Sequence, residues 1–368
     1  MVLPVLDPHG DLVDLAAALC DVPSVSGGER ALADAVEQVL RGAGHLEVLR
    51  DGDTIVARTH LDRAERVVVA GHLDTVPVAG NLPTRRLTRP GPDGAGRPVL
   101  WGRGTVDMKG GVAMILAAAV RLTAPTRDVT WVLYDQEEVA AHRNGLGRVM
   151  REHPGWITGD FAILGEPTSG GIEGGCNGTL RVEVTVPGVA AHSARSWRGV
   201  NAIHGAAPVL AALAAYEAPA VEVDGLVYQE GLNAVGISGG IAGNVIPDEC
   251  VVTVNHRFAP ARTVADSEAF LREFFAGLEV TVTDASPGAR PGLDHPAAAD
   301  FVAAVRAVTG RTPVAKVGWT DVARFTALGV PAVNFGPGDP ALAHADDEHC
   351  PTDEIVRCFE GLRDFLTS

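Results

Sequence analysis

Apolar residues recur along the first half of the chain in two different rhythms. One has the spacing of an amphipathic helix, and the other consists of short continuous apolar runs that are typical of buried strands. Ser26 and the glycines after it could begin the second helix. Strands that alternate with helices predict an α/β sheet that is largely parallel and flanked by helices. The predicted helices are 11–20, 29–41 and 110–122, the predicted strands are 66–70, 129–134 and 161–164, and a polar loop is expected at 80–98.

The middle of the chain follows another pattern, and the α/β pattern returns after it. The order strand, helix, strand, strand, helix, strand is that of a ferredoxin-like α+β unit. We therefore expect a first domain from residues 1–178 and 287–368, with an inserted lid and dimerisation domain at 179–286. The middle elements are predicted at 180–186, 200–216, 232–238, 249–258, 264–275 and 278–283, with a helix at 297–308, a strand at 330–335 and a helix at 353–366 after them.

Composition narrows the class of protein. A chain of 368 residues suits two domains, and its net charge of −16 argues against a general binder of nucleic acid or anionic membranes. The five cysteines are odd in number and not closely paired, which fits a reduced cytosol, and Cys350 is expected to be a buried thiol. The N-terminal segment does not look like a signal peptide, and no apolar run is long enough for a membrane span. We expect a cytoplasmic protein.

Histidine and carboxylate side chains stand where predicted strands end. His72, Glu137, Glu138 and Glu166 each follow a predicted strand directly or closely. Ligands of parallel sheets bind at the carboxyl ends of the strands, so these side chains are expected to meet at one edge. Imidazoles and carboxylates are ligands of divalent metals such as zinc. The pattern predicts a hydrolytic metal site at this edge.

Each stretch taken alone has a simpler interpretation. Asp74 can accept the second ring N–H of a metal-bound His72, but a hydrogen-bonded core pair explains GHLDTVP equally well. Asp107, in GRGTVDMKGG, can bridge two cations because a carboxylate has two oxygens. The same turn could be a phosphate-binding loop or a helix cap, although Lys109 lacks the following Ser or Thr of a P-loop.

The pair Glu137–Glu138 can divide two roles. Adjacent side chains diverge, so one can bind metal while the other faces the attacking water. Like charges this close raise a pKa unless a cation is present, and a raised pKa suits a general base. A solvent-exposed acidic pair is the alternative. His344, in PALAHADDEH, is a weak signal alone but adds a second imidazole.

Together these stretches resemble the dinuclear zinc hydrolase family of acetylornithine deacetylase, succinyl-diaminopimelate desuccinylase, aminoacylase and glutamate-releasing carboxypeptidase. The resemblance covers nearly the whole chain and implies two Zn²⁺ per subunit, for which Co²⁺ or Mn²⁺ can substitute. It implies that one ion takes His72 and Glu166, that the other takes Glu138 and His344, and that Asp107 bridges them.

The resemblance also assigns residues around the metals and in the lid. It implies that Glu137 is the general base, that Asp74 supports His72, and that a cis peptide follows Asp107. In the lid, VPGVAAHSARS implies that His192 reaches the active site of a partner subunit in a homodimer. The resemblance also implies that two residues of the inserted domain contact the substrate. They are Asn244, in GGIAGNVIPDE, and Arg257, in NHRFAP.

Three departures from the family pattern bear on the substrate and leave the metal chemistry untouched. The acid that usually precedes the glutamate pair is Gln136, with Asp135 one place earlier. The Arg-Arg-Gly that precedes the lid in desuccinylases is replaced by CNG at 176–178. The loop usually rich in Gly, Thr and Ser reads GWTD at 318–321, where Thr320 is the candidate substrate contact.

The runs EGGCNGTLRVEV and HSARSWRGVNAIH look like those of actinobacterial desuccinylases, which implies N-succinyl-L,L-2,6-diaminopimelate as the substrate. This compound carries three carboxylates, and guanidinium groups bind carboxylates bidentately. Arg195, Arg198 and Arg257 are therefore candidates, with solvated turn residues as the alternative for the first two. The near rival is acetylornithine deacetylase or another N-acyl-amino-acid deacylase or carboxypeptidase. The distant rival is a non-catalytic binding protein, which the intact Glu137 and ligand set oppose.

Overall fold

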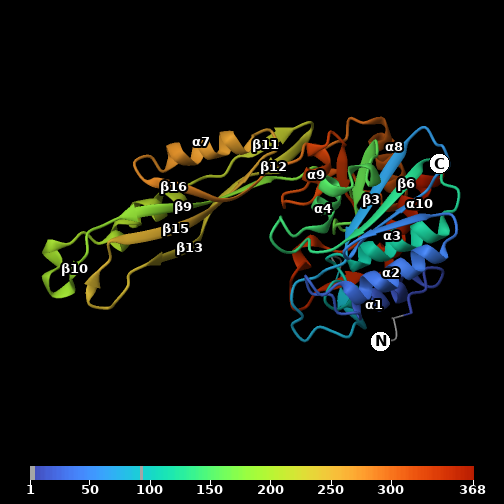
Figure 1. Ribbon diagram of the computed structural model, residues 1–368, viewed down its shortest axis with the longest axis horizontal. Helices are drawn as coiled ribbons and strands as arrows, with labels where there is room; N and C mark the ends of the chain where they lie inside the picture. The colour runs from blue at the N-terminus through green and yellow to red at the C-terminus, as the bar shows by residue number, and fades with distance from the viewer. Residues whose placement is uncertain (1–4, 92–93) are drawn as a thin grey trace. The chain divides into compact units, whose positions relative to one another are not determined.

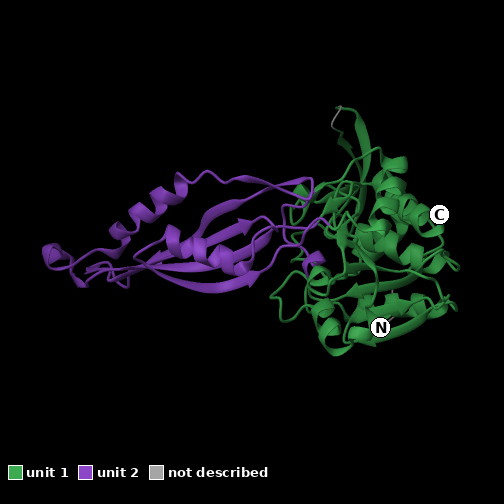
Figure 2. Ribbon diagram, turned by 90° about the horizontal axis from the view of Figure 1, so that it is seen from above, with its two compact units in different colours: residues 1–174, 292–314, 324–368 green, residues 175–291, 315–323 purple. Residues whose placement is uncertain are grey.

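The computed structural model describes residues 5–91 and 94–368 (Figure 1). Residues 1–4 of the N-terminal segment and 92–93 of the expected polar loop lie outside the described part. The chain divides into two compact units (Figure 2), one made of 1–174, 292–314 and 324–368 and the other of 175–291 and 315–323. The expectation had placed all of 287–368 in the first domain.

Residues 315–323 group with the second unit because they pack there. Asn177 N donates a hydrogen bond to Lys316 O at 3.3 Å. Ala315 packs against a small apolar cluster that contains Tyr228 and Ala259. A short segment from the C-terminal third of the chain therefore completes the inserted unit.

The first unit is built on an eight-stranded sheet with strand order β1-β2-β6-β3-β7-β18-β8-β17. The four central strands, β6, β3, β7 and β18, are parallel to one another, which confirms the predicted α/β sheet. The outer strands β1, β2 and β8 pair antiparallel. The strands are β1 (Glu47–Asp51), β2 (Thr54–Arg58), β3 (Arg66–His72), β6 (Asp128–Tyr134), β7 (Phe161–Leu164), β8 (Glu173–Gly174), β17 (Val314–Ala315) and β18 (Ala332–Asn334).

Alternate residues of the central strands point to opposite faces of this sheet. Val67 and Val69 of β3 belong to the main core, together with apolar residues of α1, α2, α3, α8 and α10. Helix α4 contacts β2 and β6. The helices of the first unit are α1 (Leu12–Cys20), α2 (Arg30–Gly42), α3 (Lys109–Arg121), α4 (Gly145–Glu152), α8 (Pro296–Thr309), α10 (Thr352–Thr367) and all but the first two residues of α9 (Val322–Ala327), with short 3₁₀ turns at Pro154–Trp156 and Pro340–Leu342.

A three-stranded antiparallel sheet corrects the expectation of a structureless loop at 80–98. Strands β4 (Arg85–Pro90) and β5 (Gly96–Trp101) pair with each other, and β19 (His349–Pro351) pairs with β5. The segment gave no strand signal because β4 is charged and largely exposed. The pairing matters for the site because β5 leads directly into the turn that carries Asp107, and β19 follows the segment that carries His344.

The second unit has the predicted ferredoxin-like arrangement. Its four-stranded antiparallel sheet has the order β13-β15-β9-β16, and the apolar side chains of one face form a core with those of α5, α6 and α7. The elements are β9 (Gly178–Pro187), β10 (Ala191–His192), a 3₁₀ segment (Ser193–Arg198), α5 (Ala202–Gly205), α6 (Ala207–Ala214), β11 (Ala220–Val223), β12 (Leu226–Gln229), β13 (Gly231–Gly239), β14 (Val245–Ile246), β15 (Glu249–Phe258), α7 (Val264–Phe274) and β16 (Glu279–Ser286).

The single helix expected at 200–216 is two helices. Pro208 lies in the first turn of α6, where a residue without a backbone N–H is tolerated because that donor has no partner inside the helix. Pro208 therefore starts a new helix after α5. In the described part of the chain, no helix is long and apolar enough to cross a membrane.

Candidate functional site

Asp107 lies between two histidines of the first unit. It stands in the turn between β5 and α3, and the expected cis peptide bond joins it to Met108. Its Oδ1 is 3.1 Å from Nε2 of His72, and its Oδ2 is 3.4 Å from Nε2 of His344. The two oxygens of one carboxylate thus face two different imidazoles, which is the arrangement that a bridging ligand requires.

Two groups of ligand atoms share this carboxylate. His72, Asp107 and Glu166 form one group, and Asp107, Glu138 and His344 form the other. Within each group, one ligand atom of every residue lies within 4.8 Å of the others. Glu138 Oε1 is 2.9 Å from His344 Nε2. The five side chains that the sequence proposed as metal ligands are therefore brought together.

The sheet explains why these residues meet. His72 ends β3 and is in register with Tyr134 at the end of β6, after which the chain runs on to Glu137 and Glu138. Glu166 follows β7, which pairs with β3 on its other side. The carboxyl ends of three adjacent parallel strands thus deliver an imidazole and three carboxylates to one edge, as expected of an α/β sheet.

Asp74 holds the glutamate pair in place. This side chain is fully buried, its Oδ1 accepts from Glu137 N at 3.0 Å, and its Oδ2 accepts from Glu138 N at 3.1 Å. The hydroxyl of Ser26 donates to Oδ2 at 2.7 Å. The carboxylate therefore fixes the backbone from which both glutamates project, and Glu137 itself forms a ligand-type group with His72 and Glu138.

Asp74 contacts His72 through its main-chain oxygen as well as through its carboxylate. His72 Nδ1 lies 3.0 Å from the main-chain oxygen of Asp74 and 3.5 Å from its Oδ1. The backbone oxygen is the nearer acceptor because the carboxylate is already shared by the two amides and Ser26. A proton on Nδ1 leaves Nε2, on the Asp107 side, free to bind a metal.

The imidazoles and carboxylates shift one another's pKa values. Hydrogen bonds that His344 donates to Asp107 and Glu138 raise its pKa to about 10. Burial would lower the pKa of His72, but hydrogen bonds to Asp107 and Asp74 raise it well above its ordinary value. Burial would raise the pKa of Asp107, but hydrogen bonds from both histidines hold it below its usual range.

This donor set fits two divalent cations. The overlapping groups contain four carboxylates, Asp107 included, and two imidazoles, and mixed nitrogen and oxygen ligands suit zinc. Two imidazoles, even when protonated, balance only two of the four carboxylate charges, so divalent cations would supply the positive charge that this cluster lacks. His72, Asp107, Glu138, Glu166 and His344 could hold the ions, and Glu137 is left free beside them.

Two residues that support the glutamate pair, the partly buried Ser26 and the buried Glu29, were not found from the sequence. Ser26 does not begin the second helix, because α2 starts at Arg30 and the Ser26 hydroxyl bonds Asp74 instead. Glu29 Oε1 accepts from Gln136 N at 3.2 Å, and Gln136 has a φ of 59°. A glutamate so close to a helix start reads as a cap, so no local signal marked its contact with a distant loop.

The acid one place earlier has a structural role. Asp135 is buried, and its Oδ1 accepts from Arg148 Nη2 at 2.8 Å and from the Thr54 hydroxyl at 2.5 Å. Gln136 Nε2 donates to its other oxygen at 3.0 Å. Although Gln136 departs from the family pattern, the loop before the glutamate pair is therefore held by hydrogen bonds to Asp135.

The second unit places two of its candidates side by side. His192 lies in β10, opposite Val245 of β14, and Ser193 N donates to Asn244 O at 2.9 Å. Both His192 and Asn244 are exposed. His192 Nδ1 accepts from Ala194 N at 3.1 Å, so the proton of a neutral ring is on Nε2, which remains available as a donor.

The other candidates of this unit differ in burial. Arg257, on β15, is partly buried, and its Nε donates a hydrogen bond to Asn255 Oδ1 at 3.1 Å. Among the described residues, Arg257 forms no ion pair. Burial lowers the pKa of Arg257, with a contribution from the nearby Arg181. Arg195 and Arg198 are exposed in the 3₁₀ segment after His192, and Thr320 is buried.

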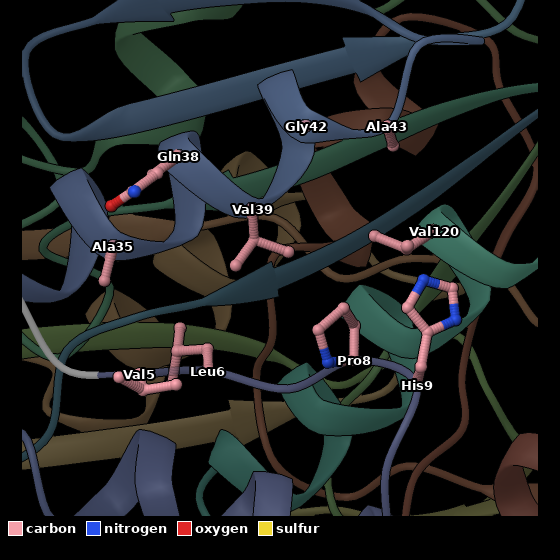
Figure 3. A pocket seen from close by; sticks show the side chains of 10 residues that line it. All are labelled: Val5, Leu6, Pro8, His9, Ala35, Gln38, Val39, Gly42, Ala43 and Val120. Atoms are coloured by element: carbon pink, nitrogen blue, oxygen red, sulfur yellow. The ribbon is translucent and has the colours of Figure 1, made fainter.

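Two other features of the first unit do not extend the site. Asp51, Glu152 and His153 could form a ligand group, but Asp51 is paired with Arg148 at 2.7 Å and His153 stacks on Trp156. Among the described residues, no carboxylate lines a cavity of about 640 Å³ beside α2 (Figure 3). Its lining is Val5, Leu6, Pro8, His9, Ala35, Gln38, Val39, Gly42, Ala43 and Val120.

Known relatives are similar in sequence to this chain over nearly its full length. A protein of Mycobacterium tuberculosis provisionally named succinyl-diaminopimelate desuccinylase is 52% identical over 98% of this chain and 99% of its own. The succinyl-diaminopimelate desuccinylase of Corynebacterium glutamicum is 45% identical over 99% of this chain and 98% of its own. A crystal structure of a tripeptidase from Staphylococcus aureus covers 98% of both chains with a TM-score of 0.76 at 18% identity, and so shares the fold.

The family model of peptidase family M20/M25/M40 matches residues 68–368. The matched span begins just before His72 and includes all five proposed metal ligands, whereas Ser26, Glu29 and Thr54 precede it. Members of this family are metal-dependent hydrolases, in agreement with the ligand groups around Asp107. The chain belongs to peptidase family M20/M25/M40.

Proposed function

We propose that this protein is a dinuclear zinc amidohydrolase that cleaves N-succinyl-L,L-2,6-diaminopimelate to succinate and L,L-2,6-diaminopimelate, a step of lysine and cell-wall synthesis. The reaction type is carried by one observation, the position of Asp107 with an oxygen toward each of two histidines. The identity of the acyl group and of the amine in the substrate is proposed from the names of the two relatives that match nearly the whole chain. We place the enzyme in the cytosol.

The metal ligands are assigned by the two groups around Asp107. His72 and Glu166 would hold one ion, Glu138 and His344 would hold the other, and Asp107 belongs to both groups. Zinc is the metal that we favour because imidazole and carboxylate are its ordinary ligands in hydrolases. When bound, zinc would supply the charge that polarises the amide carbonyl and lowers the pKa of water.

Glu137 is the proton carrier in this proposal. Its backbone is fixed by Asp74, and it stands within the ligand group of His72 and Glu138 without being needed as a ligand. The carboxylate accepts the proton of the attacking water and then gives it to the leaving amine, so one group serves as base and then as acid. His192 supplies the Nε2–H that stabilises the negative charge developing on the carbonyl oxygen.

The substrate carboxylates are assigned to residues of the second unit. Arg257 is the strongest candidate because its guanidinium is partly buried and lacks an ion pair among the described residues. A planar guanidinium of this kind binds a carboxylate through two parallel hydrogen bonds. Asn244, Arg195 and Thr320 are assigned to the substrate by family resemblance, and Asn244 is supported by its position beside His192.

We also propose a homodimer formed through the second unit. Strand β13 is an edge of the four-stranded sheet, and its Val235 and Ile237 side chains are 59% and 53% exposed. An exposed apolar edge strand is a template for pairing with another chain. Ile203 and Ile241 of the same unit are also exposed. A second copy of this surface would cover them, and His192 would then serve the active site of the partner.

Metal removal and reloading test this function directly. Protein stripped with a chelator should release no succinate from N-succinyl-L,L-2,6-diaminopimelate, and added Zn²⁺ should restore the release as the second equivalent binds. Asp107→Ala protein should hold far less metal and stay inactive. Full activity in stripped protein, or with one ion and no second site, would contradict the proposal.

A further inference from the structure

Glu348 is a buried acid at the junction of two segments that supply ligands. It is the last of three consecutive acids, of which Asp346 and Asp347 are exposed whereas Glu348 is 0% exposed. It lies shortly after His344 and directly before β19. Because β19 pairs with β5, and β5 leads into the turn that carries Asp107, Glu348 stands between both segments.

On one side, Glu348 holds the turn that carries Asp107. Its Oε1 accepts hydrogen bonds from Val106 N at 2.9 Å and from Asp107 N at 3.2 Å. Its main-chain oxygen accepts from Gly102 N at 2.9 Å. The carboxylate thus fixes the peptide group from which the central ligand projects.

On the other side, Glu348 and Arg103 hold the segment that carries His344. Arg103 Nη1 is 2.8 Å from Glu348 Oε2 and also donates to Ala345 O at 3.3 Å. The two side chains of this ion pair are only 3% and 1% exposed. His344 has a φ of 65°, a strained conformation for a non-glycine residue that persists only where its surroundings enforce it.

We propose that Glu348, together with Arg103, is a positioning residue that sets the separation between the Asp107 carboxylate and the His344 imidazole. This inference rests on the proposed metal site and goes beyond it by naming what controls its second ion. It implies an asymmetry. The ion held by Asp107, Glu138 and His344 depends on both segments that Glu348 ties together, whereas the other ion takes two of its ligands from β3 and β7.

The substitution Glu348→Gln is informative because glutamine cannot satisfy both sides. If its oxygen accepts from Val106 N and Asp107 N, its amide group faces the donors of Arg103. If the amide is turned round, its hydrogens face the two backbone N–H groups. Either orientation opposes donors in a buried place, so the two segments should move apart although the side chain keeps its size.

The test is a cobalt titration of metal-free full-length protein, followed by calorimetry and visible absorption. Wild type should bind two Co²⁺ per chain. Glu348→Gln should bind the first ion with an affinity near that of wild type and the second roughly 10- to 100-fold more weakly, the range seen when residues supporting metal ligands are replaced. Its cobalt absorption spectrum at full loading should also differ from that of wild type.

Asp128→Asn is the matched control. Asp128 is also buried, accepts from two backbone N–H groups, Leu61 N and Arg63 N, and lies 3.6 Å from an arginine, Arg66. It starts β6, at the opposite end of that strand from the glutamate pair. This variant should lose thermal stability while keeping both cobalt affinities and the spectrum.

Unchanged affinity for both ions and an unchanged spectrum in Glu348→Gln would overturn the inference and leave the metal site standing. Should Glu348→Gln fail to fold, Glu348→Asp decides, because a shorter carboxylate keeps the charge but cannot reach both Arg103 and the amides. It should weaken the second ion by a smaller factor, and two wild-type affinities in it would overturn the inference. Fewer than two ions in wild type would instead refute the proposed site.

Discussion

Glu137 and Glu138 are neighbours in the sequence with different surroundings in the structure. Glu138 Oε1 is 2.9 Å from His344 Nε2, in the ligand group of Asp107. We therefore expect Glu137→Ala to lose turnover by on the order of 10²–10⁴-fold, as for removal of a general base, while metal content stays near that of wild type. Glu138→Ala should lose metal. Steady-state rates and elemental analysis of the same preparations measure both effects.

The two variants serve as controls for each other, since they remove the same carboxylate from adjacent positions. Loss of metal in Glu137→Ala with retention in Glu138→Ala would show that the roles are exchanged. Full turnover in Glu137→Ala would remove the proton carrier from the proposal altogether.

At the same scale, the sequence indicated the ligand candidates and one supporting residue, Asp74, but not the other residues that support them. His72 and Glu166 were visible because each follows a buried apolar run, and strand ends converge in a parallel sheet. Glu348 was not, because nothing local distinguishes it from the exposed Asp347 beside it. Its burial depends on Arg103, which is remote in the chain. Supporting residues of this kind are defined by tertiary contacts.

At the scale of elements, strongly periodic segments were predictable and irregular ones were not. Helices α2 and α10 and the buried strand β6 lie within a residue or two of their predicted ranges. The β4–β5 hairpin was missed because charged, exposed residues and prolines give no alternation. The ferredoxin-like order of the second unit was predictable because its strands bury one face and therefore alternate.

One element of the second unit carries a pH dependence. His256 of β15 is fully buried against Phe258 and Phe270, and neither ring nitrogen has a hydrogen-bond partner among the residues that the structure describes. Burial, with a contribution from Arg262, lowers the pKa of His256 to about 4. The unfolded chain, with a histidine pKa of about 6.5, binds this proton first. The stabilising effect of the neutral ring is therefore complete above about pH 6.5 and is lost as the pH falls toward about 4.

We predict that this effect weakens folding by up to about 1.4 kcal/mol per pH unit within that window. Urea unfolding of full-length protein at about pH 7 and about pH 5, with a probe in the second unit, measures it. His256→Leu should flatten the slope, because the buried leucine does not titrate. An identical pH slope in wild type and His256→Leu would contradict the assignment.

At the scale of the whole molecule, the proposed homodimer makes each active site depend on two chains. His192→Ala and Glu137→Ala proteins should each be inactive as homodimers. Mixing them under conditions of subunit exchange should restore activity, because one hybrid site receives both an intact Glu137 and an intact His192. Turnover of the mixture, followed against time of mixing, measures this rescue.

The exchange itself needs a control with two differently tagged wild-type chains. If the tags exchange and the mixture stays inactive, His192 acts within its own chain or not at all. Replacement of Ile237 on the edge strand by Lys should give monomers by light scattering, because a charge on the exposed edge opposes pairing.

The substrate is the central claim, and one comparison of kcat/KM tests it most directly. Zinc-loaded enzyme should hydrolyse N-succinyl-L,L-2,6-diaminopimelate more efficiently than N-acetylornithine by more than roughly 10- to 150-fold, the factor equivalent to one charge-assisted hydrogen bond of about 1.5–3 kcal/mol to the extra carboxylate. Arg257→Ala should narrow that ratio. Equal or better hydrolysis of N-acetylornithine by the unmodified enzyme would contradict the proposal and identify the protein as a deacetylase.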